Sequence, residues 1–169
     1  MRAFYFDNLQ GDQRLLHDSG RSVSDEVLKS IGVLHWHIPT DQQSQIDAVA
    51  EERNYKNRDV ITITKEGLGD LYETKLKGFY EEHMHEDEEI RYILEGNHPT
   101  DSWIRVHLEA GDLLVLPAGI YHRFTLDEKN VIKAMRLFKD EPKWIPYNRD
   151  GATDANPYRI DYMKTLTVN

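Results

Sequence analysis

The spacing of hydrophobic residues changes near Asp59, and this change separates a helical part of the chain from a part rich in strands. Before it, Val27, Leu28 and Ile31 recur at the spacing of one helix face, and Gly32 follows as the residue type that commonly ends a helix. After it, hydrophobic and polar residues alternate in short runs between turn residues, which is typical of β-strands. The pattern predicts a mostly β fold with short N-terminal helices.

Two helices are predicted before the main run of strands. Ser22 and Ser24 can cap the first, and Thr40, with Gln43 three residues later, indicates a capped start for a second helix that runs to about Tyr55. Several short strands at close spacing favour a barrel or a sandwich. The residues expected on the buried face of the second helix are Ile46, Val49 and Ala50. The expected strands are residues 33–38, 60–64, 71–76, 78–85, 89–94, 103–108, 113–116, 121–126 and 131–138.

The composition argues against several classes of function. A net charge of -9 and a pI near 5.3 make nucleic acid and anionic membrane surfaces poor partners. The chain has no cysteine, so it has no disulfide and no thiol nucleophile, which fits a reducing compartment. No apolar run approaches the roughly 18 residues needed to span a bilayer. We therefore expect a cytoplasmic protein with no membrane insertion and no nucleic-acid binding.

Four residues form a candidate set of metal ligands. His83 and His85 stand two apart, so on a strand their imidazoles point to the same side, and Glu89 can arrive from the next strand. His122 can complete the set. Three imidazoles and one carboxylate suit iron, nickel or another mid-row divalent ion, and the absence of sulfur argues against a structural zinc knot or an iron-sulfur cluster. Four ligands on an octahedral ion leave two positions for a substrate.

Glycine and proline residues at fixed distances strengthen this interpretation. Gly96 follows the first three candidate ligands, Gly111 indicates a turn between strands, and Pro117 and Gly119 indicate a turn that brings His122 back toward the other three. The two patterns are His-x-His-x-x-x-Glu-x-x-x-x-x-x-Gly and Gly-x-x-x-x-x-Pro-x-Gly-x-x-His. Together they resemble the two signature motifs of the cupin superfamily, whose fold is a small double-stranded β-helix barrel with the metal inside.

The residues around these motifs narrow the resemblance to the acireductone dioxygenase family. The likeness spans nearly the whole chain and is closest in residues 79–83, 89–94, 116–125 and 133–138. Residues 89–94, with the sequence Glu-Ile-Arg-Tyr-Ile-Leu, are the part that other cupin enzymes would not be expected to share.

The resemblance implies an activity and its cofactor. The family cleaves 1,2-dihydroxy-5-(methylthio)pent-1-en-3-one, an acireductone, with dioxygen in methionine salvage. With iron the products are formate and 4-methylthio-2-oxobutanoate. With nickel they are formate, carbon monoxide and 3-(methylthio)propanoate. We expect one Fe²⁺ or Ni²⁺ per chain on the four ligands, a small-molecule substrate and O₂ as partners, a monomer, and a location in the cytoplasm and also the nucleus.

Five further residues are expected around the metal. Arg91 lies two residues after the ligand carboxylate, so on a strand it enters the same interior, where a guanidinium is costly unless an anion meets it. It could simply pair with that carboxylate, but the resemblance implies a catalytic role in holding the anionic substrate. Phe79, Ile93 and Phe124 lie where the family lines its pocket, although they could equally be core residues. Arg149 is a substrate contact by resemblance alone.

The chain departs from the general pattern at two points. The segment of six residues after Gly96 is shorter than in relatives, and Leu126 stands where the cupin pattern has asparagine. We expect one domain with an N-terminal helical and strand segment (1–58), a barrel core (59–140) and a C-terminal extension (141–169).

Other charged and histidine-rich stretches are given simpler interpretations. His35 and His37 form a second His-x-His, but no carboxylate follows at the required step, so they are expected on a strand surface. A group of acidic residues near the first motif is expected to be a solvated rim. Its members are Glu81, Glu82, Glu86, Asp87 and Glu88.

Two hypotheses of other kinds stay open at this point. The chain could be another metal-dependent cupin enzyme, such as an isomerase or a different dioxygenase. It could also be a metal-bound cupin that binds a ligand without turnover. Oxygen consumption would separate these cases from an acireductone dioxygenase.

Overall fold

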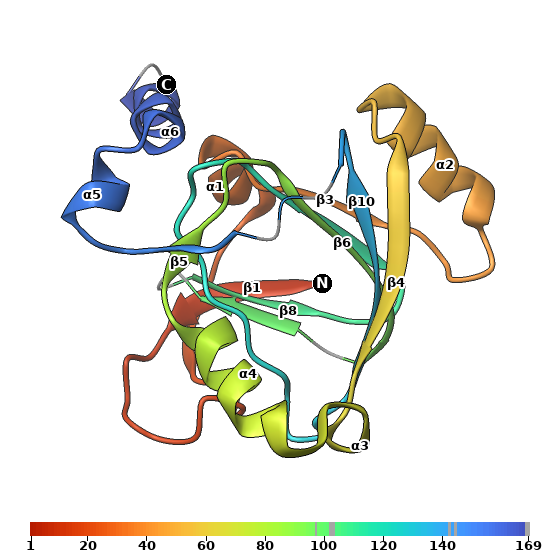
Figure 1. The fold of residues 1–169 in the computed structure, drawn as a ribbon, viewed down its shortest axis with the longest axis vertical. Helices are drawn as coiled ribbons and strands as arrows, with labels where there is room; N and C mark the ends of the chain where they lie inside the picture. Colours follow the sequence, from red (N-terminus) through yellow and green to blue (C-terminus); the bar gives the residue numbers. More distant parts are fainter. Residues whose placement is uncertain (97, 102–103, 142, 144, 168–169) are drawn as a thin grey trace.

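The computed structural model describes residues 1–96, 98–101, 104–141, 143 and 145–167 of the chain (Figure 1). Two antiparallel sheets enclose a common hydrophobic interior, and helices lie around them. The strands are β1 (Arg2–Phe6), β2 (Asp18–Ser22), β3 (Leu34–His37), β4 (Asn57–Ile63), β5 (His83–Met84), β6 (Glu89–Gly96), β7 (His98–Asp101), β8 (Ile104–Leu108), β9 (Asp112–Leu116), β10 (Ile132–Phe138) and β11 (Tyr147–Asn148). The helices are α1 (Asp25–Ser30), α2 (Gln43–Glu52), α3 (Lys65–Leu68), the 3₁₀ helix η1 (Gly69–Leu71), α4 (Tyr72–Tyr80), α5 (Gly151–Asp154) and α6 (Pro157–Thr167).

One sheet has four strands in the order β2-β1-β8-β7, and the other has five in the order β3-β9-β6-β10-β4. A third, two-stranded pairing joins β11 to β5. The strands expected near residues 33–38, 89–94, 113–116 and 131–138 are all present. Strands β1 and β2 are missing from the sequence-based expectation, yet β1 pairs with both β2 and β8. The N-terminal segment therefore supplies strands to both large sheets, because β3 pairs with β9.

The five-stranded sheet buries side chains on both of its faces. Residues on its inner face join residues of the four-stranded sheet in one cluster, as Ile132 and Ala134 of β10 do with Val106 of β8. On its outer face, Met135 and Leu137 belong to a second cluster with residues of α2, which lies against this sheet in Figure 1. The residues that α2 contributes are Ile46, Val49 and Ala50, as predicted. Helix α2 begins at Gln43, but its N-cap is Gln42, which makes no side-chain cap hydrogen bond, so the capped start expected at Thr40 is wrong.

The predicted strands over residues 71–76 and 78–85 are also wrong, because most of this stretch is helix α4. Tyr72, Leu76 and Phe79 recur at intervals of four and three residues, which places them on one helix face. Tyr72 and Leu76 are buried there. The expected strand over residues 121–126 is reduced to two bridge positions, at His122, which pairs with His83, and at Phe124.

The short segment after Gly96 still forms a hairpin. Strand β7 pairs with β8 along its four residues in an antiparallel register, and β10 pairs with β6 as far as Gly96. Trp103, which was expected in this strand, and Trp144 lie outside the described residues. Helix α1 follows its expectation, since Ser24 is its N-cap and accepts a hydrogen bond from the backbone of Val27.

Among the described residues, no helix has both the length and the apolar character needed to cross a membrane.

Candidate metal centre

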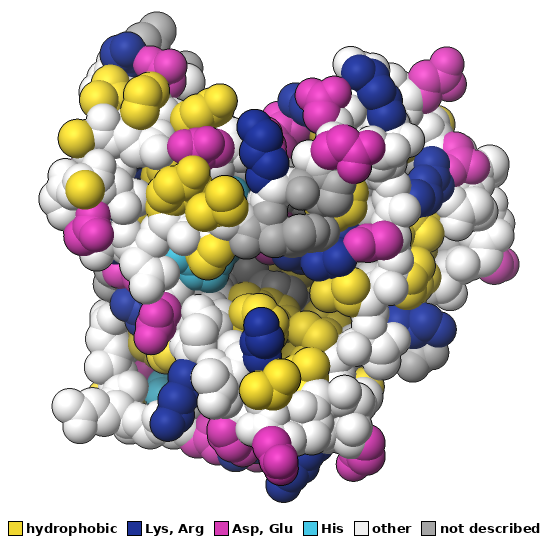
Figure 2. Space-filling view, in the orientation of Figure 1, with side chains coloured by type: hydrophobic (Ala, Val, Ile, Leu, Met, Phe, Trp, Pro, Cys, Tyr) yellow, Lys and Arg dark blue, Asp and Glu magenta, His cyan; other side chains and the backbone are white. Residues whose placement is uncertain are grey.

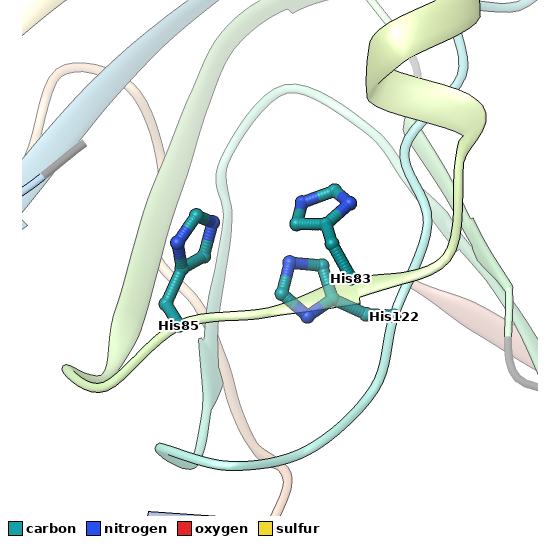
Figure 3. Close-up of side chains that lie close together, drawn as sticks. All are labelled: His83, His85 and His122. Carbon is teal, nitrogen blue, oxygen red and sulfur yellow. The ribbon is translucent and has the colours of Figure 1, made fainter. Parts of the chain in front are cut away.

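The first two histidines are held by backbone pairing on both sides of a very short strand. His83 begins β5, and β11 pairs with β5 on one side so that Asn148 lies opposite His83. On the other side, the backbones of His83 and His122 exchange two hydrogen bonds of 3.1 and 2.8 Å. His85 follows β5 directly, so the two-residue spacing brings both imidazoles to the same side of the strand (Figure 3).

The turn before His122 depends on a glycine. Gly119 has φ +80°, and a Cβ at this position would lie 2.3 Å from the carbonyl oxygen of Tyr158 in α6. Its amide donates a hydrogen bond of 2.9 Å to the carbonyl of His85, and its own carbonyl accepts one of 3.0 Å from Arg159. The turn is therefore clamped between the ligand strand and α6, and only glycine fits it without a shift of the backbone.

The three imidazoles form one compact group. Each offers a ring nitrogen, and these nitrogens lie within 4.8 Å of one another (Figure 3). Each Nδ1 donates to a backbone carbonyl: His83 to Glu81 at 2.7 Å, and His122 to Ile120 at 3.2 Å. For His85 the acceptor is the carbonyl of residue 145, at 3.0 Å. A carbonyl only accepts, so each Nδ1 carries the proton and each Nε2 presents a lone pair.

Glu89, the first residue of β6, brings a carboxylate to the same point. Its Oε2 lies 3.2 Å from Nε2 of His85 and 3.2 Å from Nε2 of His122. Its Oε1 lies 3.3 Å from Arg91, so the two oxygens serve different partners. The structure thus brings together all four residues that the sequence predicted as ligands.

The charges of the group favour cation binding. Burial and the charge of His122 lower the pKa of His83 to about 4, so this imidazole is neutral at pH 7. Burial acts to raise the pKa of Glu89, but Arg91 and His122 outweigh it and hold this pKa well below its usual value. Burial likewise acts to lower the pKa of His85, but the neighbouring Glu89 carboxylate outweighs it and raises this pKa, so a metal must compete with a proton for Nε2 of His85. A neutral imidazole and an ionised carboxylate are the protonation states in which these groups bind metals.

A cavity of about 630 Å³ opens onto this group. Figure 2 looks onto this face, where hydrophobic side chains gather around a hollow and a histidine surface is visible. Arg91, Phe79 and Phe124 line the cavity, as the resemblance implied, and the two phenylalanine rings contact each other edge to face at 5.5 Å. The remaining lining residues are Ile61, Ile63, Thr74, Lys75, Gly78, Glu81, His83, His85, Glu89, His122, Ile132, Ala134, Arg136, Pro146 and Asn148.

Two predicted substrate contacts do not line the cavity. Ile93 lies on the inner face of β6, as expected, but it is fully buried in the cluster between the two sheets. Arg149 follows β11 and turns outward, where its side chain is 45 % exposed, pairs with Glu82 at 2.8 Å and lies over the ring of Tyr121. The alternation of side chains along the strand correctly predicted that Ile93 faces the interior. It could not predict that the cavity ends before reaching this residue.

Sequence reasoning missed most of the apolar wall, which comes from β4 and β10. Ile61, Ile63, Ile132 and Ala134 alternate along these two strands and face the cavity. The signal was present as a period of two in the sequence, but the pairing that places the strands together joins residues far apart in the chain. Arg136 was missed for the same reason.

The histidines of the second His-x-His motif contact a buried aspartate instead of forming part of the cavity. His35 and His37 of β3 both contact Oδ1 of Asp112, at 3.1 and 2.9 Å. Asp112 is fully buried, and its Oδ2 lies 2.9 Å from the amino group of Met1. A carboxylate does contact both histidines of this motif. It comes from Asp112 of β9, and not from a residue shortly after His37 in the sequence.

The acidic group near the first motif is only partly a solvated rim. Glu82 pairs with Arg149, and Glu88 pairs with Arg53 at 3.0 Å and accepts a hydrogen bond of 2.8 Å from Tyr55. These acids therefore hold neighbouring segments in place.

The donor set fits a mid-row divalent cation. Three Nε2 lone pairs and one carboxylate oxygen point toward one position beside an open cavity, and the chain has no cysteine to offer a thiolate. Such a donor set between two antiparallel sheets defines a metal-binding cupin.

Comparison with known proteins gives the family. The pattern of the ARD/ARD′ family matches residues 2–146, so the chain belongs to this family. Acireductone dioxygenase 1 of Coprinopsis cinerea is 60% identical, with 99% of both chains covered. The acireductone dioxygenase of Sclerotinia sclerotiorum is 55% identical, covering 98% of this chain and 97% of its own.

A solved structure has the same fold. Acireductone dioxygenase from Bacillus anthracis, with a cadmium ion in its active centre, superposes with a TM-score of 0.64 at 24% identity. The match covers 76% of this chain and 93% of that one.

The expected class of function is confirmed. The chain is an enzyme, a metal-dependent dioxygenase that acts on acireductone in methionine salvage. Enzymes of the family use iron or nickel, and the group of three histidines provides a place for the metal.

Proposed function

We propose that His83, His85, Glu89 and His122 hold one Fe²⁺ or Ni²⁺ per chain, and that Arg91 contacts the anionic substrate beside it. The reaction is the cleavage of 1,2-dihydroxy-5-(methylthio)pent-1-en-3-one by dioxygen. The iron form yields 4-methylthio-2-oxobutanoate and formate, and the nickel form yields 3-(methylthio)propanoate, formate and carbon monoxide.

One observation carries the ligand assignment: every Nδ1 of the three histidines is committed to a backbone carbonyl. This fixes the tautomer and the ring orientation, so the three Nε2 atoms face the same position as Oε2 of Glu89. Rings held in this way lose little freedom when a metal binds.

Arg91 supplies the charge for substrate binding. Its guanidinium lines the cavity 3.3 Å from Oε1 of Glu89, the oxygen turned away from the histidines. Burial lowers the pKa of Arg91, but the group remains a cation near neutral pH. A cation here favours the deprotonated form of an enediol and orients it through charge-assisted hydrogen bonds.

The bound metal would act as a Lewis acid that coordinates and activates the substrate. The apolar wall of the cavity suits the methylthio chain, because Phe79, Phe124, Ile61 and Ile132 present hydrophobic surface beside the charged end. The same surface excludes water from the reacting carbons.

The remaining expectations are part of this proposal. We infer one folding domain, made of the N-terminal segment (1–58), the barrel core (59–140) and the C-terminal extension (141–169), acting as a monomer. We further propose that the protein works in the cytoplasm and the nucleus. The net charge of -9 supports the absence of nucleic-acid binding.

The test is elemental analysis combined with product identification, after separate loading of the full chain with iron and with nickel. We expect about one ion per chain, dioxygen uptake with the acireductone, and carbon monoxide only from the nickel form. Bound metal without oxygen uptake would favour a binding module instead. Uptake with a different enediol or diketone, but not with the acireductone, would favour another cupin enzyme.

A further inference from the structure

A second arginine, Arg136, lines the same cavity and stands directly opposite Arg91. Strand β10 lies between β6 and β4, so the register pairs Arg136 with Arg91 on one side and with Asp59 on the other. Residues directly opposite one another in an antiparallel sheet point to the same face. Asp59, Arg136 and Arg91 therefore form one row across three strands on the inner face of the sheet.

Like charges in directly opposite positions destabilise a sheet, so two arginines in this arrangement need compensation. Each contacts an acid, Glu89 from the same strand for Arg91 and Asp59 from the next strand for Arg136. Glu89 lies 3.3 Å from Arg91, and Asp59 accepts two hydrogen bonds from Arg136, at 2.7 and 2.5 Å. When Glu89 shares its charge with a bound cation, less negative charge is left to offset the two guanidinium groups. The charge that faces the cavity then becomes more positive.

The pair with Asp59 also fixes the orientation of Arg136. Two parallel hydrogen bonds between a guanidinium and a carboxylate hold the planar group in one geometry. Asp59 is 44% exposed at the edge strand β4, whereas Arg136 is 16% exposed and lines the cavity. The acid therefore holds the arginine from the side away from Arg91 and is not itself part of the cavity lining.

We propose that Arg136 and Arg91 together form the anion-binding subsite for the substrate, and that Asp59 is the positioning residue that holds Arg136 there. The subsite fits a small dianion with two neighbouring oxygens, such as the fully deprotonated enediol. This inference rests on the proposed function, because it takes the anionic substrate to bind beside Glu89.

The test uses the nickel-loaded full chain, with oxalate as an unreactive dianion. Isothermal titration calorimetry gives Kd for oxalate, and steady-state kinetics give KM and kcat for the acireductone. Loss of one charge-assisted hydrogen bond predicts that Arg136→Gln raises Kd and KM about 10- to 100-fold, with a smaller change in kcat. Arg136→Lys keeps the positive charge but loses the paired donors of the planar guanidinium, so its affinity should lie between those of Arg136→Gln and wild type. Asp59→Asn should fall between wild type and Arg136→Gln.

Arg58→Gln is the matched control. Arg58 is the neighbour of Asp59 on β4 and pairs with Asp47 of α2 at 2.6 Å, on the outer face of the sheet. The variant removes the same charge from the same sheet without touching the cavity wall. Its Kd and KM should stay within about twofold of wild type, because Arg58 is exposed on the other face of the sheet and its charge is screened by solvent.

The proposal is overturned if Arg136→Gln binds oxalate and acireductone within twofold of wild type at unchanged nickel content. It is also overturned if Arg58→Gln causes an equal loss, which would reduce the effect to net charge. If Arg136→Gln fails to fold, wild-type Kd values in both Arg136→Lys and Asp59→Asn would reject it. If the wild-type protein does not turn over acireductone, the proposed function fails, but oxalate binding still decides the role of Arg136.

Discussion

The chain carries two His-x-His motifs on β-strands, and only one of them forms a candidate metal centre. At His83 and His85, backbone carbonyls take the Nδ1 protons and the Nε2 atoms converge beside a cavity. At His35 and His37, both rings turn to a single oxygen of Asp112, which is fully buried. In the first motif the imidazoles have lone pairs to offer, while in the second they complete the hydrogen bonding of a buried acid.

The difference shows that ligand spacing is necessary but does not decide the function of a histidine pair. Both motifs place two imidazoles on one side of a strand, and each has a carboxylate oxygen within 3.2 Å. What separates them is the partner of the second ring nitrogen and the space in front of the pair. Among the described residues, the cavity is lined by His83 and His85 but not by His35 or His37.

The largest expected effect breaks the first motif. His83→Ala or Glu89→Ala should abolish metal binding and lower dioxygen uptake by more than about 100-fold, because three donors cannot replace the complete set. His35→Ala is the matched control and should keep about one metal ion per chain. Elemental analysis of the purified variants makes the comparison. Equal metal loss in His35→Ala would show that the two motifs are not functionally distinct.

The next effect separates substrate binding from metal binding within the first site. Arg91→Ala should retain its metal, since the guanidinium contacts Oε1 of Glu89 and not the oxygen that faces the histidines. Its kcat/KM for acireductone should fall by about 100-fold or more, from the loss of a buried charge-assisted contact. Arg2→Ala, which removes an arginine that is 56% exposed, is the control. Normal turnover by Arg91→Ala would contradict the substrate role.

A smaller effect, on stability alone, breaks the second motif. Asp112→Asn removes a buried charge that contacts His35, His37 and the amino group of Met1, and should lower the free energy of unfolding by about 3 kcal/mol. Urea unfolding measures the loss. Metal content should not change, and a parallel loss of metal would show that the two regions are coupled.

The loss of stability at acid pH should depend on the same carboxylate, that of Asp112. Burial acts to raise the pKa of Asp112, but hydrogen bonds from His35, the Glu109 amide, Met1 and His37 outweigh it and lower this pKa. A carboxyl whose folded pKa lies below its unfolded value of about 3.9 stabilises the protein above that value, and this contribution is lost as the pH falls toward the folded pKa. The difference in unfolding free energy between wild type and Asp112→Asn should therefore be large near pH 5 and should narrow below about pH 4. A constant difference over this range would contradict the lowered pKa.

The smallest expected effect is that of His37→Ala. This side chain is 60% exposed, so its contact with Asp112 is largely screened by water. The free energy of unfolding should change by less than about 1 kcal/mol, which urea unfolding near pH 7 can check. A larger change would mean that His37 matters to the buried acid as much as its covered partner His35.

The sequence predicted those parts of the fold where local pattern and pairing agree. Strands β6, β9 and β10 and helices α1 and α2 lie where their hydrophobic spacing predicts them. Helix α4 was mistaken for strands, because a short stretch with hydrophobic residues at several spacings fits both periods. Strands β1 and β2 were missed because β1 takes its place by pairing with β8, about 100 residues away, and β2 then pairs with β1, so neither is set by a local pattern.

For the site, residue type and spacing predicted which four residues come together, since all four converge. They could not predict the depth of the cavity, so Ile93 was expected to line it but lies in the core. Nor could they show that Asp59 and Arg136 face Arg91, because that register exists only once β4, β10 and β6 are side by side.

The three acceptors that orient the ligand rings belong to the main chain of Glu81, Ile120 and Ile145. A carbonyl oxygen is the same whichever side chain its residue bears. Substitutions at these three positions can therefore accumulate without disturbing how the imidazoles are aimed, provided that the path of the polypeptide is kept. The path of the backbone therefore fixes the geometry of the three imidazole donors. Sequence differences at these neighbouring positions say little about whether that geometry is kept.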